Sequence, residues 1–299
     1  MINRLVIIIF LVASLTCVAQ TQSDVNVSEG GYGMIKTNIT VNYDHTWNAV
    51  SDGFGARVSY QAYKNDWLTL SANFKHSSVT VDFEKDDLSD GYTPGNVSIN
   101  GTHVMGQVGV TANVRTKLFG KPFFGIAMVG SDWGKSGFER VSATLMGMIM
   151  LRATRNTQFG IGPLVMVNSS SKIPAFLVFM YRHRFNDKLQ LNLYGGMLGI
   201  EYNPTKNNLI TAGADIDVKS FYFKAENERL PDICRFTMTS FRPMIKYRHR
   251  LAKNLYFDAQ GGVSLKMSCR VNGKNGTKEY FDCKQSPSLF FQTGVSYSL

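Results

Sequence analysis

Basic side chains recur at alternate positions in two short stretches of the sequence. The set comprises Arg182, Arg184, Arg242, Lys246, Arg248 and Arg250. Residues two apart on a β-strand share one face. If the opposite, apolar faces meet lipid, these basic side chains line the interior of a barrel near its periplasmic mouth. Rings of Arg or Lys in a pore favour anions, so the pattern predicts an anion-favouring lumen.

Acidic residues on the same predicted inward faces offer a second explanation for this pattern. They are Asp215, Asp217 and Asp258. Buried charges are costly unless they are paired, so these carboxylates are expected to form ion pairs with some of the basic residues. In that case the ion pairs stabilise the interior of the barrel and do not select a solute. The sequence leaves both explanations open.

A catalytic site has little support in the sequence. His76 and Ser78 share one strand face and resemble the His and Ser pair of membrane-embedded lipid deacylases, but neither an orienting third group nor an oxyanion hole accompanies them. The remaining histidines lack metal-ligand spacing, no C-x-x-C pair is present, and no G-x-x-x-x-G-K-[ST] motif indicates ATP binding. We therefore expect no enzyme, no metal and no cofactor.

Three cysteines follow the first 19 residues, and an odd number permits one disulfide and one free thiol. Cys269 and Cys283 flank a predicted long loop, so a disulfide between them is expected to stiffen that loop. Pairing of Cys234 with either of the other two remains open, because connectivity does not follow from sequence.

The first residues indicate export. Residues 1–19 combine Arg4, an apolar stretch from Leu5 to Leu15 and small residues near Ala19, which is the pattern of a secretory signal peptide. The mature domain is then expected to span residues 20–299. The net charge is +10, but an exported chain rarely meets nucleic acid, so nucleic acid is not an expected partner.

Period-2 alternation dominates the rest of the sequence. Between Thr102 and Leu118, and again between Leu255 and Met267, apolar and polar residues alternate over lengths that suit a tilted membrane strand. Short polar turns are expected at 64–66, 119–122, 155–157, 185–188, 203–208 and 251–254, with longer loops between them, one of them over 131–137. Six turns predict an all-β, antiparallel up-and-down barrel of about 14 strands, if 189–202 folds at Gly195 and Gly196. The alternative is 12 strands.

The end of the chain resembles the C-terminal assembly signature of outer-membrane β-barrels. Its residues are Gln292, Gly294, Tyr297 and Leu299, although such families usually end in Phe. The chain is thus similar to poorly characterised outer-membrane β-barrel families of Gram-negative bacteria. This resemblance implies a place in the outer membrane, and outer-membrane lipid and the barrel-assembly machinery as partners. It also implies that the last strand pairs with the first, because an open edge in lipid leaves backbone groups unsatisfied.

Two functions from different classes fit these observations. The first is a passive channel or transporter for small solutes, with selectivity set by inward charge. The second is a structural or surface-binding barrel whose lumen is plugged, for example by the large inward residues Phe221, Phe223, Tyr256 and Phe290. A membrane lipid-modifying enzyme is a remote third alternative.

Overall fold

The protein is an antiparallel β-barrel in its computed structural model, which describes residues 38–89, 91–135, 137–167, 175–194, 197–274 and 278–298. The predicted signal peptide, Gly195, Gly196 and Leu299 lie outside these residues. The strands are β1 (Asn38–Thr46), β2 (Val50–Lys64), β3 (Leu68–Val81), β4 (Gly101–Leu118), β5 (Lys121–Gly134), β6 (Gly137–Ala153), β7 (Thr157–Val167), β8 (Ala175–Arg184), β9 (Leu189–Tyr194), β10 (Met197–Thr205), β11 (Asn208–Lys224), β12 (Ile233–Ala252), β13 (Leu255–Gly273), β14 (Glu279–Asp282) and β15 (Ser288–Ser298).

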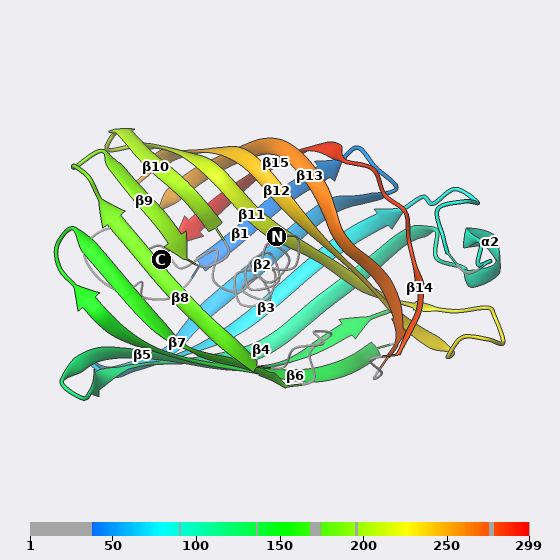
Figure 1. Cartoon of the computed structure of the whole chain (residues 1–299), viewed down its shortest axis with the longest axis horizontal. Helices are drawn as coiled ribbons and strands as arrows, with labels where there is room; N and C mark the ends of the chain where they lie inside the picture. The colour runs from blue at the N-terminus through cyan, green and yellow to red at the C-terminus, as the bar shows by residue number, and fades with distance from the viewer. Residues whose placement is uncertain are drawn as a thin grey trace, which may run out of the picture.

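Fourteen of these strands form a closed ring. Each strand from β1 to β13 pairs with its neighbour in sequence, β13 pairs with β15, and β15 pairs with β1, where Ile39 lies opposite Tyr297. The short strand β14 extends the outer end of β13 and is not part of the ring. The prediction of 14 strands and of first-to-last closure is confirmed. Residues 189–202 do contain two strands, so the 12-strand alternative is wrong (Figure 1).

The short turns lie together at one end of the barrel. Each of the six predicted turns joins two consecutive strands. At the β4–β5 turn, Phe119 and Gly120 both adopt positive φ, as a two-residue hairpin turn requires. The N–H of Ser298 donates to the carbonyl of Asn254, so the final strand also ends at this end. Short turns mark the periplasmic end of outer-membrane barrels.

One predicted long loop is a tight turn. The stretch 131–137 was expected to form an extended extracellular loop, but β5 continues to Gly134 and β6 begins at Gly137. The expectation was wrong because Ser131, Asp132 and Trp133 belong to the strand despite their polarity. Asp132 is buried inside the barrel. Among the described residues, the other long extracellular segments are 82–89 with 91–100, which contains the short helix α2 (Pro94–Val97), 225–232 and 278–287.

Large apolar side chains cover the outside of the ring. The outward faces expose, among others, Ile39, Val41, Val58, Phe74, Val110, Val129, Leu145, Leu177, Ile245 and Val295. Aromatic residues flank this belt toward both ends, as in a membrane barrel. Tyr60, Trp67, Tyr202 and Tyr247 are exposed toward the short turns, and Trp47, Phe54 and Phe138 toward the long loops. Within the described residues, no helix is long and apolar enough to cross a bilayer.

The interior is not uniformly polar, which corrects the expectation that apolar residues face lipid and only polar ones face inward. Strands β11, β12 and β13 have 17, 20 and 19 residues, well beyond the roughly 9–11 that a membrane strand needs. Their outer ends project toward α2 and β14 (Figure 1). Once strands leave the bilayer, their inward faces can bury an ordinary apolar core.

Candidate functional site: the barrel interior

Arg242 is the centre of a buried ion-pair network on the inner wall. Its guanidinium is 2% exposed and contacts the carboxylates of Asp217, at 2.8 Å, and Asp44, at 3.0 Å. Its Cζ lies 4.5 Å from the centre of the Phe290 ring, which adds a cation–π contact. Asp215 lies opposite Arg242 in the β11–β12 register. A cation so completely buried is stable only because carboxylates match it.

This network bridges strands that are not neighbours in the ring. Asp44 is on β1 and Arg242 is on β12, and in the closed ring β13 and β15 lie between these two strands. Lys219 of β11, also buried, donates to the hydroxyl of Thr46 at 3.2 Å and to the carbonyl of Val50 at 3.1 Å. The interactions therefore tie β11 and β12 to β1 and β2 inside the barrel.

A second charged group lies nearer the periplasmic end of β12 and β13. Arg248 Nε lies 2.7 Å from an oxygen of Asp258, and Lys246 Nζ lies 3.8 Å from the same oxygen. The Arg248 guanidinium also lies over the ring of Tyr256, with Cζ 5.8 Å from its centre. Two cations thus contact the same carboxylate on this wall.

The two predicted lumen arginines on β8, Arg182 and Arg184, have different surroundings. Arg182 donates through two nitrogens to the side-chain carbonyl of Gln190, whose amide in turn donates to Glu201. Arg184 forms an exposed ion pair with Asp187 at 3.1 Å. Arg250, at the same end of the barrel, donates to the carbonyls of Ala252 and Lys253. The predicted basic residues therefore form three separate groups along the wall and no single ring.

Several members of these groups were missed by the sequence analysis. Asp44, Glu201 and Lys219 all lie on inward strand faces, so alternation could have identified them as lumen residues. Their contacts with Arg242, Gln190 and Thr46 join strands that are distant in sequence, and no spacing rule predicts such contacts.

An apolar patch occupies the lumen wall formed by β5 to β8. Its buried members are Phe124, Met146, Met148, Met150, Leu164, Met166 and Val178, with Ile126, Phe176, Met180 and Tyr194 packed against them. Methionine is flexible and fills irregular gaps, which suits a wall that adapts to what it contacts. The interior thus has a charged side on β11–β13 and an apolar side on β5–β8.

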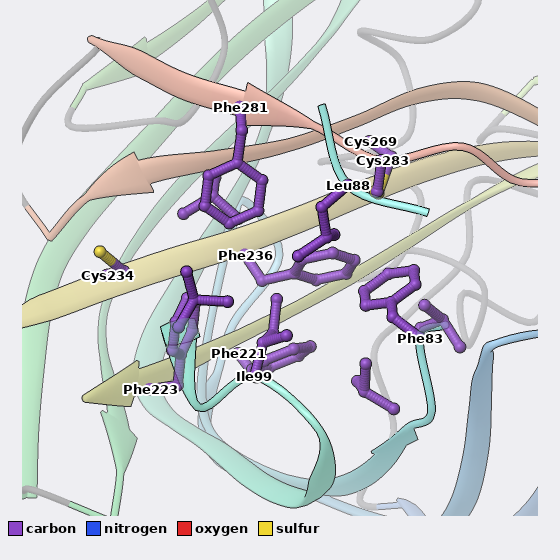
Figure 2. Close-up of a cluster of buried hydrophobic side chains, with 14 of the residues drawn as sticks. Phe83, Leu88, Ile99, Phe221, Phe223, Cys234, Phe236, Cys269, Phe281 and Cys283 are labelled. Carbon is purple, nitrogen blue, oxygen red and sulfur yellow. A yellow bond between two sulfur atoms is a disulfide. The ribbon is translucent and has the colours of Figure 1, made fainter. Parts of the chain in front are cut away.

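An apolar cluster closes the extracellular end; we call it the cap. It contains Val50, Val79, Val81, Phe83, Leu88, Val97, Ile99, Phe221, Phe223, Ala225, Leu230, Cys234, Phe236, Met238, Cys269, Val271, Phe281 and Cys283. Figure 2 shows the rings of Phe221 and Phe236 together at its centre, with centroids 4.6 Å apart. The ring of His103, which belongs to β4, stacks on the ring of Phe221, with centroids 4.1 Å apart. Residues from both sides of the barrel therefore meet in one core.

A disulfide joins Cys269 to Cys283 at the edge of the cap (Figure 2). It connects the outer part of β13 to the segment between β14 and β15. Cys234 is a free, buried thiol in the same cluster. Cys269, Cys283 and Asp282 are close enough to resemble a metal site, but both sulfurs are consumed by the disulfide.

The C-terminal signature residues have structural contacts in the last strand. Gln292 points inward and accepts a hydrogen bond from Gln260 at 2.5 Å, whereas Tyr297 is exposed on the lipid face. A Cβ at Gly294 would lie 2.8 Å from the carbonyl oxygen of Val41, so only glycine fits against β1 there. Glycine therefore allows the first and last strands to pair closely.

The His76 and Ser78 pair has a structural explanation. The Ser78 hydroxyl accepts a hydrogen bond from the N–H of Phe54 at 3.0 Å and donates to its carbonyl at 3.3 Å. Phe54 lies in a β-bulge of β2, where ladder pairing is interrupted. The His76 ring packs beside Trp133. Ser78 thus satisfies backbone groups that the bulge leaves unpaired.

Comparisons with known proteins identify other barrels. No protein-family model matches the sequence, and no curated protein matches it. Similar solved structures include an outer membrane channel from Pseudomonas putida F1, with 11% identity, a TM-score of 0.45 and coverage of 92% of this chain and 100% of that chain. A FadL homologue from Pseudomonas aeruginosa has 10% identity, a TM-score of 0.44 and coverage of 89% and 91%. Outer membrane phospholipase A from Escherichia coli has 9% identity, a TM-score of 0.38 and coverage of 88% and 96%.

At these identities and TM-scores, none of the likenesses identifies the activity of this chain. Its location follows from its own architecture. Ring closure pairs the strand edges, an apolar belt covers the outside, and aromatic residues flank that belt at both ends. The chain is an outer-membrane β-barrel.

Proposed function

We propose that this barrel is a passive channel or transporter for small solutes and that its lumen favours anions. The observation that carries the proposal is the concentration of positive charge near the periplasmic end. Five basic side chains lie on inward faces there: Arg182, Arg184, Lys246, Arg248 and Arg250. Arg184 pairs with Asp187, Lys246 and Arg248 both contact Asp258, and Arg182 reaches Glu201 through Gln190. Fixed positive charge in a low-dielectric passage raises the local concentration of anions.

Arg250 contributes most directly to this positive charge. Its described partners are the carbonyls of Ala252 and Lys253, which are dipoles and leave its full charge in place. Arg248 and Lys246 add two further cations on the same inward face of β12, where both contact Asp258. An anion entering from the periplasmic end meets these side chains first.

A plugged scaffold is the second candidate, and two observations favour it. The cap packs apolar side chains together at the extracellular end, and the Arg242 network bridges β1 and β12 inside the barrel. A cap that stays packed would oppose the passage of a solute at this end. A barrel that never opens would serve as a rigid support for its extracellular loops.

Single-channel conductance in planar bilayers separates these candidates. The purified barrel should give discrete openings, and its reversal potential in a salt gradient should indicate anion preference. The double variant Arg248→Ser/Arg250→Ser should shift that potential toward cations, because it removes two positive charges from the lumen wall and leaves Asp258 in place. Lys253→Ser, which removes a charge from the same turn outside the strands, is the matched control and should leave the potential unchanged.

A membrane that stays silent with wild-type protein, folded by the usual gel-mobility test, would support the plugged scaffold. If the double variant opens with the same ion preference as wild type, the barrel is still a channel, but the proposal that these arginines make it anion-selective is refuted.

A further inference from the structure

A groove lies on the outer face of the barrel, away from the lumen, where β6, β7 and β8 approach the periplasmic end. It has a volume of about 460 Å³ and is lined by Arg152, Thr157, Phe159, Tyr181 and His183. Ligand pockets usually enclose about 300–1,000 Å³, so the groove has room for a small polar group. Its position on the lipid-facing side distinguishes it from a solute pathway.

A β-bulge places the charged side chain of Arg152 on the outer face of the barrel. Met146, Met148 and Met150 alternate into the barrel, and strict alternation would send Arg152 inward as well. The β6–β7 register instead shifts between Met150 and Arg152, so Arg152 lies opposite Phe159. Bulges commonly re-aim side chains in this way. Arg152 is exposed on the lipid face as a result.

The strand register assembles the groove in two rungs. Arg152 lies opposite Phe159, and Phe159 lies opposite Tyr181, which gives a row of cation, ring and phenol across three strands. One rung closer to the periplasm, Thr157 lies opposite His183. The His183 ring packs edge-on against Phe185, with ring centres 4.7 Å apart. The groove is therefore a basic site with aromatic walls.

Polar atoms in the groove remain available for a ligand. Thr157 Oγ1 lies 2.9 Å from His183 Nδ1, which leaves Nε2 as the free nitrogen of that ring. In the part of the chain that the structure describes, neither the Arg152 guanidinium nor the Tyr181 hydroxyl has a hydrogen-bond or ion-pair partner. An exposed charge costs little near a bilayer interface, so Arg152 is tolerated there without a protein carboxylate.

The chain contains an internal comparison for this groove. The sequence Tyr-Arg-His-Arg recurs at 247–250 on β12, with Tyr247 and His249 on the lipid face. There the register places Ile210 and then Tyr202 where the first copy has Phe159 and Arg152. Asn208 replaces Thr157, and its Oδ1 accepts a hydrogen bond from the Tyr247 hydroxyl at 2.7 Å. The second copy thus has a tyrosine where the first has Arg152, and its phenol is already bonded.

We infer that the groove of the first copy binds the phosphodiester of a phospholipid headgroup from the periplasmic leaflet. Arginine matches phosphate geometry with paired N–H donors, and a Tyr hydroxyl and a His N–H supply further donors. The aromatic walls suit the glycerol region, where aromatic side chains concentrate at membrane interfaces. The lipid chains extend along the apolar belt beside Leu151 and Phe179, both exposed on the same face.

Native mass spectrometry of the full-length barrel tests this inference. The protein is titrated in detergent with phosphatidylethanolamine, with diacylglycerol, which lacks the phosphate, and with inorganic phosphate. Wild type should retain one phosphatidylethanolamine in preference to diacylglycerol. Arg152→Gln should weaken this binding about 10-fold, as expected for loss of a charge-assisted contact. Arg152 is exposed, so the variant should fold.

Two variants serve as matched controls. Arg155→Gln removes a charge from the adjacent turn, and His249→Ala alters the second copy, and both should bind phosphatidylethanolamine as wild type does. If Arg155→Gln weakens phosphatidylethanolamine binding as much as Arg152→Gln does, the effect is due to general charge and the proposed site is overturned. Equal retention of diacylglycerol, unchanged binding in Arg152→Gln, or displacement of the lipid by millimolar inorganic phosphate would overturn it as well.

Discussion

At the extracellular end of β11 and β12 the inward side chains are Phe221, Phe236 and Met238, whereas further along β12 they are Arg242, Lys246 and Arg248. One pair of neighbouring strands thus supplies both an apolar core and a charged wall. The cap is buried and has a disulfide at its edge, but the periplasmic wall is partly exposed, with Lys246 and Asp258 25% and 20% exposed. The alternation of the strands is the same at both ends, so it determines which side chains face inward and not how tightly they are held.

This contrast has a physical basis in the surroundings of the strands. Within the bilayer, lipid covers the outer face of the ring and inward residues meet water or one another. Beyond the bilayer, β11 to β13 continue, and residues of 82–89, 91–100 and 278–287 pack against them (Figure 1). Those segments supply the opposite half of a core, which apolar residues stabilise as in a soluble domain. Arg242 and its carboxylates lie between these two regions and form the boundary between the apolar cap and the charged wall.

The boundary should show the largest effect on stability. Arg242→Ala leaves Asp44 and Asp217 buried without their cation, and breaking a buried pair in this way costs about 3–5 kcal/mol. Urea unfolding of the refolded barrel, followed by tryptophan fluorescence, measures this loss. If the alanine variant does not fold, Arg242→Lys keeps the charge with fewer donors and should show a smaller loss. A change below about 1 kcal/mol in Arg242→Ala, or a larger loss in Arg242→Lys than in Arg242→Ala, would mean that the buried ion pairs do not stabilise the barrel.

The disulfide should show the next largest effect, confined to the cap. Its cysteines are 14 residues apart in sequence, and closing a loop of about that length is worth about 3 kcal/mol in the chain-entropy model. Cys269→Ser/Cys283→Ser should therefore increase proteolysis of 274–287 while leaving the periplasmic turns resistant. Reductant should produce the same pattern in wild type and no further change in the double variant. Equal sensitivity at both ends would contradict the separation of the cap from the rest of the barrel.

The sequence predicted the ring well because membrane strands depend on local rules. Period-2 alternation and short polar turns gave 14 strands, and the turn at 189–202 was needed to keep the number even. The cap was not predicted, since it depends on where β11 to β13 leave the bilayer and on which loops fold over them. Phe221, Phe223 and Phe290 were recognised as large inward residues. Their roles, two in the cap and one against Arg242, follow only from three-dimensional packing.

The candidate site shows the same limit. Alternation placed the basic residues on one face, but it could not show that Arg242 is matched by Asp44 across the lumen. Bulges add a further difficulty, because one extra residue reverses the faces of everything beyond it. Arg152 lies beyond such a bulge and points to lipid, although its spacing from Met148 and Met150 would place it inside.

The smallest effect is expected at the periplasmic rim. Arg184 and Arg250 are solvent-accessible, with Arg184 paired to an almost fully exposed Asp187, and exposed ion pairs contribute about 0–1 kcal/mol. Arg184→Ser and Arg250→Ser should each leave the unfolding free energy within that range, in the same urea experiment that detects the loss in Arg242→Ala. All three substitutions remove one positive charge from β8 or β12, so net charge does not explain a difference between them. A loss at the rim as large as that at Arg242 would show that burial does not distinguish these sites, and the contrast between the two ends would fail.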